Sequence, residues 1–183
     1  MAEVNLLDQY PKLSRNPDER AATITAEDRR IAKQFGREFF DGSRNRGYGG
    51  YRYDGRWVPV VKRFVEYYNL TGSSRVLDVG CAKGFMLHDF IQVVPGITVA
   101  GIDISQYAID SSMEDVSPFL RVGNAKDLSM FGNKSFDLVI SINTIHNLKP
   151  EECKQALAEI QRVGRHAFIT VDAWRTPEEE VRM

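Results

Sequence analysis

From residue 75 onward, short apolar runs alternate with longer stretches in which apolar residues recur at helical spacing. The short runs predict buried strands, and the longer stretches predict helices. We expect strands at 76–79, 98–104, 119–123, 136–143 and 166–174, with helices at 85–94, 106–113 and 150–163 between them. This alternation indicates an α/β fold, with a mostly parallel sheet and helices on both of its faces.

The first 74 residues have a different pattern, which predicts an N-terminal helical cap. We expect an irregular arm at 1–24, because two prolines interrupt it. Thr25 and Asp28 have the spacing of a capping box, so a helix is expected to begin there. Its apolar face would be formed by residues that recur every fourth position, Ile31, Phe35 and Phe39. A second amphipathic helix is expected at 58–72.

The segment 41–57, between these two helices, is rich in glycine, tyrosine and arginine. We interpret it as a lid, because glycine hinges and aromatic walls suit a loop that closes over a ligand. The residues expected to line this lid are Tyr48, Tyr51, Tyr53, Arg56 and Trp57. An ordinary exposed loop and a strip that stacks on RNA bases are the other interpretations. Acidic residues within the segment disfavour RNA.

Charge and composition narrow the class of protein. The 183 residues carry a formal net charge of −1, so no overall field favours a nucleic acid or an anionic membrane. The two cysteines give neither a disulfide framework nor a metal-ligand cluster, and we expect no metal. Without a signal-peptide core or a membrane-length apolar run, we expect a cytoplasmic protein. We treat 1–74 (arm, cap and lid) and 75–183 (sheet domain) as parts of one structural unit.

Residues that carry chemistry are expected at the carboxyl ends of the strands, where open parallel sheets bind ligands. The first strand leads into Asp78-Val79-Gly80-Cys81-Ala82-Lys83-Gly84. Gly80 permits a tight turn, and Gly84 permits close approach of the backbone to a ligand. The loop opens a helix, whose free N–H groups attract an anionic group. Asp103 ends the second strand about 20 residues further on, where a carboxylate holds a ribose diol. Together these features indicate an adenosine-containing ligand.

This loop resembles the first motif of the class I, Rossmann-fold methyltransferases that use S-adenosylmethionine (SAM). That motif has the form acid-x-Gly-x-Gly-x-Gly, and here Ala82 replaces the middle glycine. The resemblance covers residues 75–174 and includes Gly101-Ile102-Asp103-Ile104-Ser105, Gly123-Asn124-Ala125 and Phe136-Asp137-Leu138-Val139-Ile140-Ser141. It implies a Rossmann-like sheet, SAM as the cofactor and S-adenosylhomocysteine (SAH) as the product.

The resemblance also implies a role for each matching residue. The methionine end of SAM is expected at Gly80, Cys81, Ala82 and Gly84, with Asp78 ordering the loop or holding the amino group. Asp103 would hold the ribose. The adenine would contact Ile104, Asn124 and Ala125, and the reactive methyl would lie beside Ser141 to Asn143. We expect Cys81 to be a buried residue and not a nucleophile. Lys83 is expected to face solvent, because SAM offers no phosphate.

The expected reaction transfers the SAM methyl group to O, N or C of a small-molecule acceptor. A sulfonium is already an activated leaving group, so positioning is the main task of the protein. His146, just past the fourth strand, is the candidate general base, although we favour a packing role for it. Trp174 is expected to line the acceptor side of the pocket. The alternatives are an RNA or protein methyltransferase and a SAM-binding subunit without catalysis.

The C-terminal residues predict one further helix. Thr176-Pro177-Glu178-Glu179 combines an N-cap residue, a proline in the first turn and acidic residues. Methyltransferases of this superfamily usually continue with a helix and two more strands after strand five, and these strands are expected to be missing here. Strand five would then be an exposed edge, covered by a homodimer or another partner chain. We expect these residues alone to bind SAM but to turn over weakly.

Overall fold

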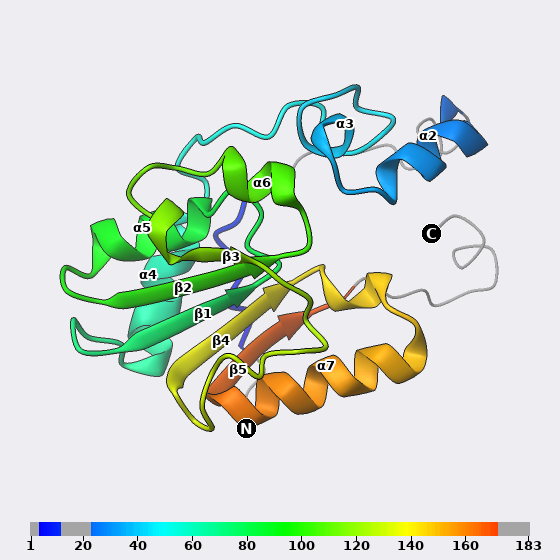
Figure 1. Cartoon of the computed structure of the whole chain (residues 1–183). Helices are drawn as coiled ribbons and strands as arrows, with labels where there is room; N and C mark the ends of the chain where they lie inside the picture. Colours follow the sequence, from blue (N-terminus) through cyan, green and yellow to red (C-terminus); the bar gives the residue numbers. More distant parts are fainter. Residues whose placement is uncertain (1–3, 12–22, 172–183) are drawn as a thin grey trace.

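The structure, a computed structural model, describes residues 4–11 and 23–171 (Figure 1). Within these residues, five parallel strands form one sheet in the order β3-β2-β1-β4-β5. The strands are β1 (Arg75–Val79), β2 (Thr98–Asp103), β3 (Leu120–Val122), β4 (Phe136–Ile142) and β5 (Gly164–Thr170). The α/β prediction is confirmed. Strand order reverses between β1 and β4, so a ligand crevice is expected at their carboxyl ends.

Helices cover both faces of the sheet, as the sequence predicts (Figure 1). Successive side chains of a strand point to opposite faces. Val76 of β1 therefore joins the core beneath α4 (Val58–Tyr68) and α5 (Phe85–Val93), whereas Leu77 joins the core beneath α7 (Pro150–Val163). Both side chains are fully buried. These two cores fix the ends of β1, β2 and β4 in space, and those ends carry the loops of the site.

The cap consists of α2 (Ala26–Ala32) and α3 (Arg37–Phe40). Helix α3 lies beside α6 (Gln106–Asp110), and α2 lies on the far side of α3 (Figure 1). The capping box between Thr25 and Asp28 is confirmed. The expectation of one helical face through Ile31, Phe35 and Phe39 is wrong, because the chain turns at Phe35. That residue adopts a left-handed φ of 48°, and Gly36 is the N-cap of α3. The Phe35 carbonyl accepts a hydrogen bond from the Ser105 hydroxyl, and this contact fastens the turn to the sheet domain.

Two short 3-10 helices complete the described chain, η1 (Ser117–Phe119) and η2 (Ile145–Asn147). No described strand flanks the outer side of β5, so what covers that edge stays a prediction. The expected helix after residue 175 and Trp174 lie outside the described residues. None of the helices in the described ranges has both the length and the apolar character needed to cross a membrane.

Candidate functional site

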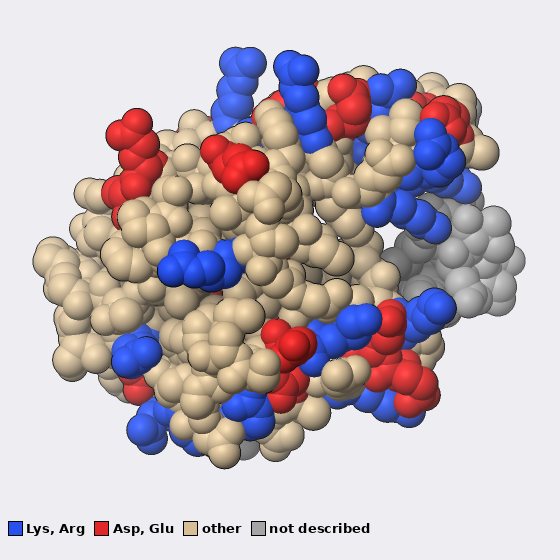
Figure 2. Space-filling model, viewed as in Figure 1, with Lys and Arg blue, Asp and Glu red and all other residues tan. Residues whose placement is uncertain are grey.

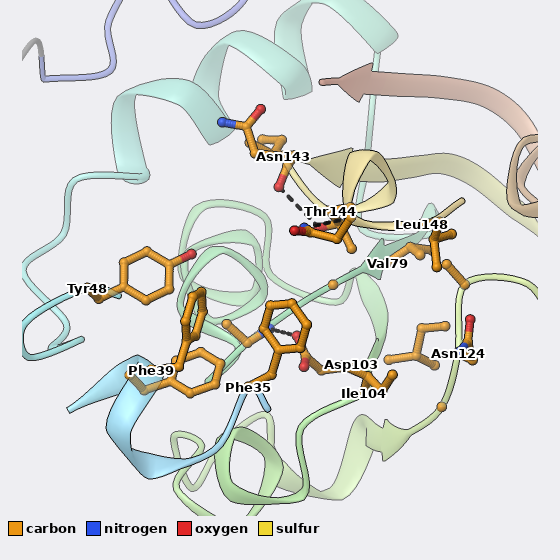
Figure 3. A pocket seen from close by; sticks show the side chains of 18 residues that line it. Phe35, Phe39, Tyr48, Val79, Asp103, Ile104, Asn124, Asn143, Thr144 and Leu148 are labelled. Atoms are coloured by element: carbon orange, nitrogen blue, oxygen red, sulfur yellow. Dashed lines mark hydrogen bonds between the residues drawn. The ribbon is translucent and has the colours of Figure 1, made fainter. Parts of the chain in front are cut away.

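A cavity of about 210 Å³ opens at the carboxyl ends of β1, β2 and β4, beneath the cap. Figure 3 shows its walls, and Figure 2 shows a hollow between the cap and the end of the sheet. The sheet side contributes the glycine loop, the end of β2 and the loops after β3 and β4. The cap contributes aromatic side chains from α3 and its flanks. The cavity therefore lies at the switch point, as expected from the strand order.

The glycine loop is folded tightly against the end of β2. The backbone N–H groups of Gly80 and Cys81 both donate to the Ile102 carbonyl, at 2.8 and 3.0 Å. Gly80, Ala82 and Gly84 have positive φ angles of 89°, 50° and 78°. A Cβ atom on Gly80 would lie 2.1 Å from Oγ1 of Thr144, so that position admits only glycine. The positive φ of Ala82 shows why glycine suits this position in the resembling motif.

Asp103 lies at the centre of the cavity and connects β2 to the glycine loop. Its Oδ2 atom accepts from the Ala82 N–H, and its Oδ1 atom accepts from the Ser105 N–H, both at 2.8 Å. The Ile104 N–H also stabilises this carboxylate. Because an ionised carboxylate has about four acceptor positions, it retains acceptor capacity for a ligand. Burial raises the pKa of Asp103, and the N–H donors of Ser105 and Ala82 oppose that effect.

Asp78 lies behind Asp103, at the bottom of the site. Only 6 % of its surface is exposed, and it does not line the cavity directly. Burial, together with the negative charge of Asp103, raises its pKa to about 7. The charge of Asp103 thus disfavours ionisation of the buried Asp78 carboxyl, and a cation placed near the two residues would favour it.

The other residues implied by the resemblance are divided between the cavity wall and the core. Ile104, Asn124, Ala125 and Asn143 line the cavity. Ile104 is 57 % exposed, an unusual exposure for an isoleucine that a flat ligand surface would cover. Ser141 and Cys81 are buried and lie outside the wall. Burial raises the pKa of the Cys81 thiol, which keeps it protonated.

Of the five expected lid residues, only Tyr48 lines the cavity. The ring of Tyr51 stacks on Phe85 at 4.8 Å, and the hydroxyl of Tyr53 donates to Oδ1 of Asp89 at 2.6 Å. The other two residues, Arg56 and Trp57, contact Asp54 and Tyr10. The segment is therefore packed onto the sheet domain along α5, and only its first part faces the cavity.

Lys83 does not face solvent, so that expectation is wrong. Its side chain is 9 % exposed, and its Nζ atom contacts Oδ2 of Asp41 at 2.6 Å and the Tyr51 carbonyl at 3.0 Å. The hydroxyl of Tyr107 donates to the same Asp41 oxygen. Burial alone would raise the pKa of Asp41, but the hydrogen bonds from Lys83 and Tyr107 hold it below its ordinary value. The cap covers Lys83, and a sequence pattern carries no signal for such a contact.

The candidate base His146 lies in η2 and is not among the residues that line the cavity. Its neighbours Thr144 and Asn147 do line it. Several wall residues were not anticipated from the sequence, namely Phe35, Phe39, Phe40, Thr144, Asn147 and Leu148. Within the described ranges, no group of three or more His, Cys, Asp or Glu side chains is placed to hold a metal ion.

The fold and the cavity define an open, doubly wound α/β protein with a ligand site at its switch point. Residues 76–166 match the family described as "Methyltransferase domain". This stretch therefore belongs to the Rossmann-fold, class I methyltransferases. A search of the curated proteins gave no match to the chain.

Solved structures share the fold. A protein from Pyrococcus horikoshii OT3 has 26 % sequence identity and a TM-score of 0.55, over 80 % of this chain and 66 % of that protein. A putative methyltransferase of an antibiotic biosynthesis pathway from Anabaena variabilis ATCC 29413 has 24 % identity and a TM-score of 0.51, over 61 % of this chain and 45 % of its own length. A putative SAM-dependent methyltransferase from Methanococcus maripaludis has 12 % identity and a TM-score of 0.53, over 88 % of this chain and 67 % of that protein.

Proposed function

We propose that the chain binds SAM in this cavity and transfers its methyl group to O, N or C of a small molecule. One observation carries the proposal: the glycine loop and the Asp103 carboxylate line the same cavity and are joined by the Ala82 N–H bond of 2.8 Å. The loop would hold the methionine end, and Asp103 would hold the ribose hydroxyls. The adenine would lie on the exposed face of Ile104, near Asn124.

The charges of the site favour SAM over other adenosine-containing ligands. Burial and the negative charge of Asp103 raise the pKa of Asp78, and burial raises the pKa of Asp103. A positively charged ligand would stabilise the ionised form of both carboxylates. SAM carries a sulfonium and an ammonium group, whereas nucleotides bring phosphates. The pyrophosphate of a dinucleotide would repel both carboxylates. Among the ligands that the motif admits, the cationic one therefore fits best.

The bound cofactor would supply a methyl group on an activated leaving group. The acceptor atom would form its bond to the methyl carbon as the carbon–sulfur bond breaks, with the electron pair staying on sulfur and any acceptor proton passing to water. The chain's own residues would orient the two reactants and exclude water. Its cap and glycine loop hold the two sides of the cavity at a fixed separation, so positioning is the main catalytic contribution we assign to them.

The proposal is tested first by calorimetry with SAH, and NADH serves as the phosphate-bearing comparison. We expect saturable binding of SAH and at least about tenfold weaker binding of NADH. Equal affinities would contradict the charge argument. Tritiated SAM incubated with a pool of metabolites then tests transfer. Binding of SAH without transfer to any small molecule would favour a non-catalytic subunit.

The same assay with RNA and with protein extracts tests the two macromolecular alternatives. RNA methylation would call for a basic face that follows the phosphate backbone. On the face shown in Figure 2, acidic and basic side chains are interspersed over the cap and α7 within the described part of the chain. This distribution supports a small-molecule acceptor.

A further inference from the structure

The cap side of the cavity is a continuous aromatic surface. We call Phe35, Phe39, Phe40 and Tyr48 the aromatic wall, because all four line the cavity. The ring centroids of Phe35 and Phe39 lie 5.1 Å apart, and those of Phe39 and Tyr48 lie 5.2 Å apart. The ring centroids of Phe40 and Tyr48 lie 5.8 Å apart. Figure 3 shows Phe35 beside Asp103, with Phe39 and Tyr48 extending away from it.

The cavity offers a second ligand almost no charge. Asp103 is the one charged residue among those described as lining it. Several cap charges are instead paired with other partners: Arg46 contacts Asp28 and Glu38, and Asp41 contacts Lys83. A charged acceptor beside the aromatic wall would be desolvated without a counter-ion, which is costly.

The wall opposite the aromatic rings offers hydrogen-bond acceptors. The Thr144 hydroxyl donates to the Ile142 carbonyl, so its oxygen remains available to a donor. The Asn147 amide donates an N–H to the Thr144 carbonyl, which leaves its Oδ1 atom as an acceptor. A ligand that carries one O–H or N–H group at the edge of an apolar ring would match both walls.

We propose that the methyl acceptor is an uncharged molecule with a flat aromatic ring that bears a hydroxyl or a neutral amine. The ring packs on Phe39 and Tyr48, and its polar hydrogen points to Thr144 and Asn147. This inference rests on the proposed function, because SAM takes the half of the cavity at Asp103. A cationic acceptor is disfavoured, since it would be desolvated without a counter-ion and a protonated amine has no lone pair to accept the methyl group.

Three probes with the same ring system and different charge test this inference: 2-naphthol, 2-naphthoate and 2-naphthylmethylamine. Calorimetry is performed on the full chain saturated with SAH. We expect 2-naphthol to bind and the two charged probes to bind at least about tenfold more weakly. Equal or tighter binding of either charged probe, with SAH bound, overturns the inference and leaves the proposed function intact. Failure of SAH itself to bind overturns both.

Variants of the wall connect this binding to named residues. Phe39→Ala and Phe39→Leu are expected to weaken 2-naphthol about tenfold while changing SAH affinity by less than about twofold, because a ring contact contributes most to the acceptor site. The leucine variant keeps most of the apolar volume, so it is expected to fold even where the alanine variant does not. Phe119→Ala removes a phenylalanine that is 46 % exposed and outside the cavity, and it serves as the matched control. Unchanged 2-naphthol binding in Phe39→Leu overturns the assignment.

Discussion

The Nζ atom of Lys83, in the glycine loop, lies 2.6 Å from Oδ2 of Asp41, in the cap. The two residues are 42 positions apart in the chain, and the Tyr107 hydroxyl donates to the same oxygen. The pair therefore joins the loop proposed to hold the cofactor to the segment that carries the aromatic wall. Any change in this contact is expected to move the cap relative to the glycine loop.

Asp41→Asn is expected to loosen the cap. Losing the charged partner of a buried lysine should lower the free energy of unfolding by about 1–3 kcal/mol, measured by urea titration. Because the pKa of Asp41 is depressed in the folded state, its contribution is present above the ordinary pKa and is lost as pH falls through the folded value. The difference between the parent and the variant should therefore shrink in acid.

Glu38→Gln is the matched control for this pair. Glu38 contacts Arg46 at the same distance of 2.6 Å, but its side chain is 48 % exposed. Its loss should cost less than about 1 kcal/mol. Hydrogen exchange of residues 37–51 should increase in Asp41→Asn and stay unchanged in Glu38→Gln. Equal effects of the two substitutions would contradict a special role for the Lys83 contact.

Asp103→Ala is expected to weaken SAH binding by about 1.5–3 kcal/mol, because a charge-assisted contact to the ribose is lost. The Ala82 and Ser105 N–H groups also lose their acceptor. Calorimetry measures the dissociation constant. Asp110→Ala removes an exposed carboxylate of α6 that pairs only locally with Gln106, and it should leave SAH binding unchanged. An unaltered dissociation constant in Asp103→Ala would rule out the ribose assignment.

SAH affinity is expected to rise with pH through about 7, the pKa of the buried Asp78 carboxyl. Its ionised form attracts the ligand's ammonium group and its protonated form does not, so affinity should fall by up to about tenfold per pH unit below that value. Asp78→Asn should flatten this dependence. Calorimetry at pH values of about 5.5, 6.5 and 7.5, on both sides of this pKa, measures the dependence. A slope that survives the substitution would point to another group.

The same residue has the opposite effect on stability. Its folded pKa lies above the unfolded value of about 3.9, so the folded state binds the proton more tightly, and stability falls as pH rises from the unfolded value to the folded one. Asp78→Asn should therefore unfold at a higher temperature than the parent at neutral and alkaline pH. Differential scanning calorimetry across the pH range measures the crossover, and a constant difference between the two proteins would argue against a titrating Asp78.

His146→Ala is expected to lower turnover by less than about tenfold, because His146 does not line the cavity. The assay uses tritiated SAM and whichever acceptor the metabolite screen identifies. A general base contributes about 10²–10⁴ to the rate. A loss in that range with SAH binding intact would show that His146 takes the acceptor's proton.

The sequence alone determined the sheet domain and the half of the cavity that we propose for the cofactor. Strand and helix periodicity is local, so the β1 to β5 pattern was readable within a few residues of the observed ends. The glycine loop and Asp103 were found because a turn of fixed chemistry follows a strand at a characteristic spacing. In the structure, residues at this spacing are joined by the hydrogen bond from the Ala82 N–H to the Asp103 carboxylate.

Only the tertiary structure decided the half of the cavity that we propose for the acceptor. Whether Phe39 belongs to a core or to a cavity depends on where the chain turns at Phe35, and that turn is held by Ser105, 70 residues away. Lys83 is buried because Asp41 and Tyr107 surround it, and helix or strand periodicity contains no information about such a partner. The local sequence pattern indicates which conformation a segment prefers by itself. A cavity wall depends instead on how segments that are far apart in the chain pack against one another.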